Sequence, residues 1–289
     1  MVQVTKRSAR LGGAANVALN LKALGATPIV VSVIGDDDNA ALLTKLFNEQ
    51  GLDTRGLIRS AERRTTVKTR VISGHHHVVR VDEEQENDIS TTDAQRLVNA
   101  VSELFVASKP GVLVFEDYNK GVLTEEAISG TITAAKAARV PTAVDPKKKN
   151  FFAYKGVDLF KPNLKELREG LKMEIDPTDA ASLGNAVFAL EEKLKNRISL
   201  ITLSEHGAFV HDAATHANVA AHPRKIVDVS GAGDTVIAVA ALALAQQLPT
   251  TSIAELSNLA GGIVCEEVGV VPIDVDRFRK ECERLSLPR

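Results

Sequence analysis

Residue types that mark secreted, membrane or disulfide-stapled proteins are scarce in this sequence. Its 289 residues include two cysteines, Cys265 and Cys282, no tryptophan and only 4% aromatic residues. Two cysteines cannot form a disulfide framework, which favours a reducing cytoplasm. The first residues, 1–7, lack the apolar core of a signal peptide. The longest apolar run, after Val236, stops at Gln246 and is too short to predict a membrane span.

The chain also lacks an excess of charge of one sign. Its 35 lysines and arginines nearly balance 37 aspartates and glutamates, which gives a formal net charge of -2 and a pI near 6.4. This balance predicts neither a surface for nucleic acid nor a polybasic membrane anchor. The length suits one large α/β domain, which we expect to span residues 1–289. Composition therefore predicts a cytoplasmic protein that binds neither nucleic acid nor a membrane.

Apolar runs of strand length alternate with helical segments along most of the chain. This alternation predicts an α/β fold with a parallel sheet. We expect strands over 28–35, 111–115, 141–144, 156–160, 198–203 and 225–229, and helices over 14–24, 39–50, 124–139, 164–171, 179–194 and 236–245.

The stretch from Thr65 to Asp82 breaks this pattern because its strands are polar. Lys68 and Arg70 fall on one face of the first strand, and Arg80 lies on its hairpin partner. A polar ribbon cannot lie within a buried parallel sheet, so we expect it to project as a lid. Residues 2–10 alternate like a half-exposed strand, and the predicted lid therefore comprises about residues 1–11 and 64–82.

The turn Asp228-Val-Ser-Gly-Ala-Gly-Asp-Thr-Val236 joins a predicted strand to a buried helix. Gly231, Ala232 and Gly233 let backbone N–H groups approach a ligand at a helix N-terminus, which is a site for anions. Asp234 would repel a phosphate there unless it takes part in proton chemistry. A base beside such amides is what phosphoryl transfer to a hydroxyl group needs. The alternative is a glycine turn with an acidic residue that complements the helix dipole.

Polar residues recur directly after the predicted strands. They are Asp117, Asp145, Asn163, Ser204 and Asp234. In a parallel sheet these positions share the carboxyl edge, where ligands bind, although each residue alone also suits a cap or turn. Asn163 and Glu166 lie one helical turn apart and can hold Mg²⁺ through water, while the alternative for Glu166 is a carboxylate favoured by the helix dipole.

The signature around Asp234 resembles that of the ribokinase (PfkB-type) sugar kinases. Gly12-Gly13-Ala-Ala-Asn16 is similar to their N-terminal glycine pair and asparagine, and the likeness also covers Asp145-Pro-Lys147, Lys161-Pro-Asn163 with Glu166, and Thr202 to Gly207. The resemblance implies a three-layer α/β/α fold with a mostly parallel central sheet and a small β lid. It also implies ATP and Mg²⁺ as cofactors, with a monovalent cation as a further activator.

Within this family, residues 65–71, 78–82 and 116–121 look like the kinase part of the bacterial heptose-7-phosphate kinase/ADP-heptose synthase proteins. That likeness implies phosphorylation of O1 of D-glycero-β-D-manno-heptose 7-phosphate, on the way to the lipopolysaccharide core. A fructokinase-like or ribokinase-like enzyme is the alternative within the class. A truncated, non-catalytic protein that binds nucleotide or sugar is the alternative outside it.

The resemblance implies a role for each matching residue. Asp234 would be the base, and residues 231–233 the anion hole. Asn163, Thr202, Ser204, Glu205, Gly207 and Asn258 would lie around the nucleotide, and Glu166 and Asn163 would serve the metal. The expected sugar-binding residues are Gly12, Gly13, Asn16, Lys68, Arg70, Arg80, Asp117 and Lys120. The basic residues of the lid suit a substrate that already carries a phosphate.

Two departures from the family pattern bear on this reading. Family members begin with a strand, a Gly-Asp turn and a further sugar-binding Asp before the glycine pair, whereas Gly12 lies near the start of this sequence. We therefore expect the first strand to be missing, either because the start is assigned too late or because the chain is a natural truncation. His75, His76 and His77 stand at the expected ribbon turn, where other polar residues are typical of the family. Alternation lets only His75 and His77 share a face, so we expect an exposed hairpin tip and not a complete metal site. The apolar positions Val67, Val71 and Val79 predict a homodimer through the lid.

Overall fold

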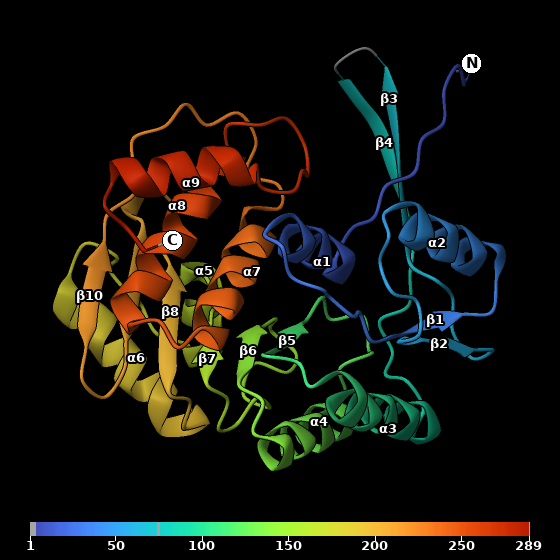
Figure 1. Cartoon of the computed structure of the whole chain (residues 1–289), viewed down its shortest axis with the longest axis horizontal. Coiled ribbons are helices and arrows are strands. Elements are labelled where there is room, and N and C mark those ends of the chain that lie inside the picture. Colours follow the sequence, from blue (N-terminus) through green and yellow to red (C-terminus); the bar gives the residue numbers. More distant parts are fainter. Residues whose placement is uncertain (1–3, 74–75, 289) are drawn as a thin grey trace.

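The computed structural model describes residues 4–73 and 76–288. Its central sheet has six strands in the order β10-β9-β8-β7-β6-β5 (Figure 1). The strands β5 to β8 are parallel, and β9 and β10 continue the sheet in antiparallel pairing. Their bounds are Leu113–Glu116, Thr142–Asp145, Leu159–Phe160, Ile198–Thr202, Ala208–His211 and His216–Val219. The expected mostly parallel sheet is confirmed.

Helices cover both faces of this sheet and give the expected three layers. One face packs on α4 (Glu125–Ala138), α5 (Leu164–Leu171) and α6 (Ala180–Leu194), in a core that includes Phe160 and Leu190. The other face packs on α1 (Ala14–Ala23), α7 (Ala232–Ala245) and α8 (Thr250–Val264), around Leu159 and Ile237. The last helix, α9 (Val275–Arg284), packs against α8.

The N-terminal part forms a second, smaller parallel pair of strands. β1 (Ser32–Gly35) pairs with β2 (Leu57–Ser60), and the helices α2 (Asp38–Glu49) and α3 (Thr91–Ser108) belong to this part. α3 packs against α4 and thereby connects the two parts. Within residues 4–73 and 76–288, no strand pairing joins β1 or β2 to the six-stranded sheet.

The predicted ribbon is confirmed. β3 (Val67–Ser73) and β4 (His76–Glu83) pair antiparallel and project away from the sheets, as Figure 1 shows. His75 lies outside the described residues. The strand expected over 2–10 is wrong for its described part, because residues 4–10 are exposed and have no regular structure. Within the described ranges, β3 and β4 pair only with each other, and residues 4–10 add no third strand to this ribbon.

The local rules for helix ends account for most of the boundaries. Thr124 and Asp179 accept hydrogen bonds from the first turns of α4 and α6, as threonine and aspartate do at N-cap positions. The strand expected over 225–229 is wrong. The N–H groups of Val227 and Asp228 both donate to the carbonyl of Cys265, so this segment follows the end of α8 and pairs with no strand. None of the helices in the described ranges combines the length and the hydropathy needed to cross a bilayer.

Candidate active site

The turn before α7 has the geometry expected of an anion site. Gly231 is the N-cap with a positive φ of 80°, a conformation that favours glycine. A Cβ at Gly231 would lie 3.2 Å from Asn16 Nδ2, so the turn also packs closely. The N–H of Ala232 donates to Val229 O, and the N–H groups of Gly233 and Asp234 have no acceptor among the described residues. Those free donors, with the helix dipole, attract negative charge.

The carboxylate of Asp234 is held at both oxygens. Asn16 Nδ2 donates to Oδ2 at 2.6 Å, and the Tyr118 hydroxyl donates to Oδ1 at 2.9 Å. Burial raises the pKa of Asp234, while these two hydrogen bonds favour the charged form and oppose the rise. Asn16 itself is buried on α1, so the base is oriented by groups from distant parts of the chain.

Charged side chains from the ends of the neighbouring strands β6 and β7 lie beside this turn. The buried Lys161 Nζ lies 3.1 Å from Asp145 Oδ2, and that oxygen lies 3.8 Å from where a Cβ of Gly233 would be. Lys147 Nζ lies 3.7 Å from Asp145 Oδ1 and 2.6 Å from Glu166 Oε1. Two cationic groups thus lie near the helix N-terminus, and two of the acids are paired with them.

Glu116, at the end of β5, completes this cluster. Burial, followed by the charges of Asp145 and Asp234, raises its pKa well above the ordinary value. For Lys147, burial favours the neutral form, but the carboxylates of Asp145 and Glu166 outweigh it and raise the pKa. Sequence reasoning assigned no role to Glu116, Tyr118, Lys147 or Lys161, although each lies within two residues of the end of a strand. That position is the signal that could have found them.

Asn163 and Glu166 form a capping box at the start of α5. The Asn163 side chain accepts from the Glu166 N–H at 2.8 Å, and Glu166 Oε2 accepts from the Asn163 N–H at 2.9 Å. One Glu166 oxygen also contacts Lys147. Within the described ranges, no group of three or more His, Cys, Asp or Glu side chains has the arrangement to hold a metal ion. The Asn163 side-chain oxygen and both Glu166 carboxylate oxygens already accept hydrogen bonds within the fold.

The expected nucleotide residues gather around the ends of β8 and β10. Thr202 forms an isolated parallel β-bridge with Asn163 through the backbone. Ser204 and Glu205 lie in the 3₁₀ turn Ser204–His206. Gly207 has a φ of 86° and packs so closely on residues 219–221 that a side chain would collide with Val219 O. Asn258 Nδ2 donates to Ala220 O at 2.9 Å. The structure therefore brings Gly207 and Asn258 to the same segment.

The expected sugar residues divide into two groups. Gly13, with a φ of 58°, lies against the ring of Tyr118, and its carbonyl accepts a hydrogen bond from the Asn16 N–H. Gly12 precedes it at the surface. Asp117, by contrast, is 2% exposed, and its carboxylate accepts hydrogen bonds from the Asn119 N–H and the Tyr154 hydroxyl. Asp117 thus anchors its loop in the core.

The basic residues of the ribbon lie on one face, as the alternation predicts. Lys68 pairs across the ribbon with Asp82, and Arg70 pairs with Arg80. Lys68 and Lys120 both contact Glu84, at 3.2 and 2.6 Å. Arg80 contacts Asp82 at 3.0 Å, and Arg70 has no ion pair in the part of the chain that the structure describes. One guanidinium of this face is therefore left uncompensated.

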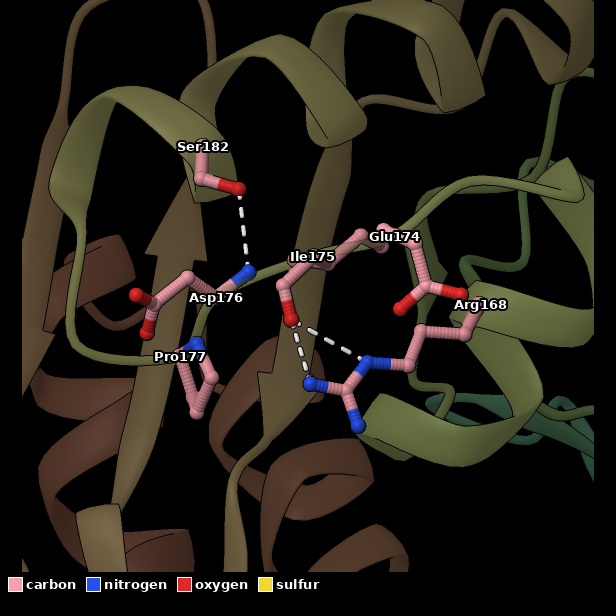
Figure 2. A pocket seen from close by; sticks show the side chains of 6 residues that line it. All are labelled: Arg168, Glu174, Ile175, Asp176, Pro177 and Ser182. Carbon is pink, nitrogen blue, oxygen red and sulfur yellow. Dashed lines mark hydrogen bonds between the residues drawn. The ribbon is translucent and has the colours of Figure 1, made fainter.

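A shallow depression of about 400 Å³ between α5 and α6 contains none of these residues (Figure 2). Arg168 Nε on its wall donates to Ile175 O at 3.1 Å, and the Asp176 N–H donates to Ser182 Oγ at 3.0 Å. These two hydrogen bonds link residues of the lining to each other. The chemistry is concentrated at the N-terminus of α7, where a fixed carboxylate can take a proton while amides and lysines stabilise a transferred phosphoryl group.

Comparison with known sequences identifies the family of this chain. Residues 1–275 match the pfkB family carbohydrate kinases. The chain is 37% identical over 283 residues to the bifunctional protein HldE of Methylobacillus flagellatus. The aligned region covers 98% of this chain and 57% of that protein. It is 42% identical over 275 residues to HldE of Caulobacter vibrioides, with 93% and 55% covered. The chain thus spans about half the length of these curated relatives.

Solved structures with the same fold are also sugar kinases. Phosphofructokinase-2 from Escherichia coli in complex with potassium has a TM-score of 0.79 at 20% identity, with 95% of this chain and 87% of that chain covered. Ribokinase from Arabidopsis thaliana, complexed with ribose and ATP, has a TM-score of 0.72 at 18% identity, with 92% and 86% covered. At such identities the likeness establishes the ribokinase-like fold.

Proposed function

Because this chain belongs to the pfkB family of carbohydrate kinases, we propose that it transfers the terminal phosphoryl group of ATP to a sugar that already carries a phosphate. Membership makes the protein a phosphotransferase with an alcohol group as acceptor. The observation that carries the proposed mechanism is the position of Asp234. It lies in the first turn of α7, beside free N–H groups, with both oxygens held by hydrogen bonds.

In the proposed reaction Asp234 accepts the proton of the sugar hydroxyl as that oxygen attacks the terminal phosphorus of ATP. A new P–O bond forms to the sugar, the bond to the ADP oxygen breaks, and the proton remains on the carboxyl group. The N–H groups of Gly233 and Asp234, with Lys161 nearby, stabilise the charge on the transferring phosphoryl group. Bound Mg²⁺ would neutralise the ATP phosphates, and Asn163 and Glu166 would hold it through water.

The proposal of a phosphorylated substrate rests on the ribbon. Arg70 and Arg80 are directly opposite each other, and like charges in that position repel. A phosphate between the two guanidinium groups would relieve this repulsion and accept charge-assisted hydrogen bonds. Together with the resemblance of residues 65–71 and 116–121, this favours D-glycero-β-D-manno-heptose 7-phosphate as substrate, with O1 as the acceptor.

We further propose that two copies associate through the ribbon. Val79 and Val81 are about half exposed on the face opposite the arginines, and Ile72 is 56% exposed near the tip. Such a ribbon with an apolar face is unstable as an isolated surface. Because the reaction consumes ATP, we place it in the cytoplasm, as the composition predicts. A monovalent-cation requirement stays a prediction from the family likeness.

The mechanism is tested with purified protein, ATP, Mg²⁺ and heptose 7-phosphate. The variant Asp234→Asn keeps the size of the side chain and removes the base, and we expect kcat to fall by at least about 10²-fold. ATP affinity, measured by calorimetry, should change little because the amide still fits the turn. Turnover close to that of the parent protein would remove Asp234 from this role.

A substrate panel tests the sugar separately. The parent protein should turn over heptose 7-phosphate with a kcat/KM well above that for fructose or ribose. A preference for either unphosphorylated sugar would favour the fructokinase-like or ribokinase-like alternative and would leave the assignment of Asp234 intact. ATP binding without turnover of any sugar would favour a non-catalytic protein.

A further inference from the structure

Tyr118 occupies the space between the base and the glycine turn of α1. Its hydroxyl donates to Asp234 Oδ1 at 2.9 Å, and its ring lies 3.6 Å from where a Cβ of Gly13 would be. The chain has only one other tyrosine, Tyr154, which is fully buried. Tyr118 is 37% exposed, so one side of its ring faces solvent at the mouth of the proposed site.

The loop that carries Tyr118 is fixed from both sides. On the core side, Asp117 accepts hydrogen bonds from the Asn119 N–H at 2.7 Å and from the Tyr154 hydroxyl at 2.8 Å. On the ribbon side, Lys120 Nζ contacts Glu84 at 2.6 Å, just beyond β4, and Arg63 donates to the Lys120 carbonyl. Asp117 and Asn119, which are joined by one of these hydrogen bonds, immediately flank Tyr118. The backbone on both sides of Tyr118 is therefore fixed, which helps to hold its hydroxyl in place.

We propose that Tyr118 is a positioning residue that orients the carboxylate of Asp234 toward the sugar hydroxyl. The proposal rests on the assignment of Asp234 as the base and adds what holds that base. A carboxylate on a helix turns about its χ angles, and one hydrogen bond from Asn16 fixes only one of its oxygens. The bond from Tyr118 fixes the second oxygen and leaves that oxygen a free lone pair for the substrate proton.

The surroundings of Asp234 determine what the loss of this bond does. Asp145 from β6 and Glu116 from β5 face it with negative or potentially negative charge, while Lys161, after β7, and Lys147 oppose them. Burial raises the pKa of Tyr118, so its hydroxyl stays protonated and can only donate to the carboxylate. This donor favours the charged form of Asp234, and its removal therefore makes the base harder to deprotonate.

The test compares Tyr118→Phe with Tyr154→Phe in the intact chain, with ATP and heptose 7-phosphate as substrates. Both variants lose a hydroxyl that donates to an acid, but only Tyr118 touches Asp234. For Tyr118→Phe we expect kcat to fall about tenfold, which is typical of one hydrogen bond to a charged group, with KM for the sugar little changed. In a plot of kcat against pH, the acidic limb should move to higher pH, because Asp234 loses a donor that favours its charged form.

Tyr154→Phe should lower the Tm, because it leaves Asp117 short of a buried donor, and should leave the acidic limb in place. The proposal is overturned if Tyr118→Phe keeps the parent kcat and pH profile, or if Tyr154→Phe moves the limb equally, since the effect would then be general damage to the loop. The variant Asp234→Asn distinguishes a failure of the Tyr118 proposal from a failure of the proposed function. An inactive Asp234→Asn with a parent-like Tyr118→Phe refutes only this inference, whereas an active Asp234→Asn refutes the base itself.

Discussion

The base site and the β3–β4 ribbon both carry clustered charges, but the charges are compensated differently. At the base site, Asp234 accepts two hydrogen bonds and the buried Asp145 pairs with Lys161. On the ribbon, Arg70 opposes Arg80 in a position open to solvent, and the valines behind them are half exposed. The base site therefore has partners for Asp234 and Asp145 before any ligand arrives, while the ribbon still lacks a counter-charge on one face and a partner on the other.

This difference follows from where each region lies. Buried charges are costly unless each has its partner, so the site must be built by the fold itself. The ribbon projects into water, where unbalanced charges cost little until a ligand or a second chain desolvates them. We infer that the site contributes orientation to catalysis and that the ribbon contributes recognition.

The largest effect we expect comes from breaking the buried ion pair of the site. Lys161→Met removes the closest cation from Asp145, whose side chain is 5% exposed, and should lower the free energy of unfolding by about 3–5 kcal/mol. Lys147, 3.7 Å away, compensates only in part. Urea unfolding followed by circular dichroism measures the loss.

The matched variant for this experiment is Lys68→Met on the ribbon. Lys68 lies 3.2 Å from Glu84, but its side chain is 38% exposed, so its loss should cost no more than about 1 kcal/mol. Equal losses for the two variants would contradict the distinction between a site completed by the fold and a ribbon that is not.

The second effect concerns recognition by the ribbon. Arg70→Gln should raise KM for heptose 7-phosphate about 10- to 100-fold, because it removes a charge-assisted hydrogen bond to the phosphate. Stability should hold or rise slightly, since the repulsion with Arg80 is lost. Initial-rate kinetics and thermal unfolding measure the two quantities.

A charge control distinguishes this clamp from a general loss of positive charge. Lys45→Gln removes a cation from an exposed pair with Glu49 on α2 and should leave KM unchanged. An unaltered KM in Arg70→Gln, or an equal rise in Lys45→Gln, would show that the ribbon does not bind the phosphate. The ribbon would then be a surface for association alone.

The same contrast explains which features could be predicted from the sequence. Helices and most strands follow from local patterns, and caps such as Thr124 and Asp179 lie where their residue types favour them. The strand expected over 225–229 failed because the acceptor for Val227 and Asp228 is the carbonyl of Cys265, far along the chain. A local pattern cannot show that a distant helix end provides the hydrogen-bond acceptor.

The candidate site could be located from the sequence, but its surroundings could not. Glycines before a buried helix and polar residues after strands make Asp234 a candidate base, with an acidic residue that complements the helix dipole as the alternative. Tyr118 was missed because its contact with Asp234 joins positions 116 residues apart. Sequence spacing also cannot tell that Asp117 points into the core while its neighbours Glu116 and Tyr118 approach the base. Such orientations depend on how the strand end is packed.

The smallest effect we expect has the opposite sign, and it asks what the completed site costs in stability. Glu116 keeps its proton in the folded chain to a pH well above 4.5, its ordinary pKa, chiefly because it is buried. The folded state then binds more protons than the unfolded state, so stability falls as the pH rises above about 4.5. Glu116→Gln mimics the protonated form and should raise the Tm at pH 7, by roughly 2–4 °C for each kcal/mol recovered. The gain should vanish near pH 4, where Glu116 is largely protonated in both the folded and the unfolded state of the parent protein.

The control is Glu125→Gln, in the exposed first turn of α4, which should produce no such pH-dependent gain. A lower Tm for Glu116→Gln at pH 7 would mean that charged Glu116 stabilises the folded protein. Burial of this carboxylate would then not reduce the stability, contrary to the prediction.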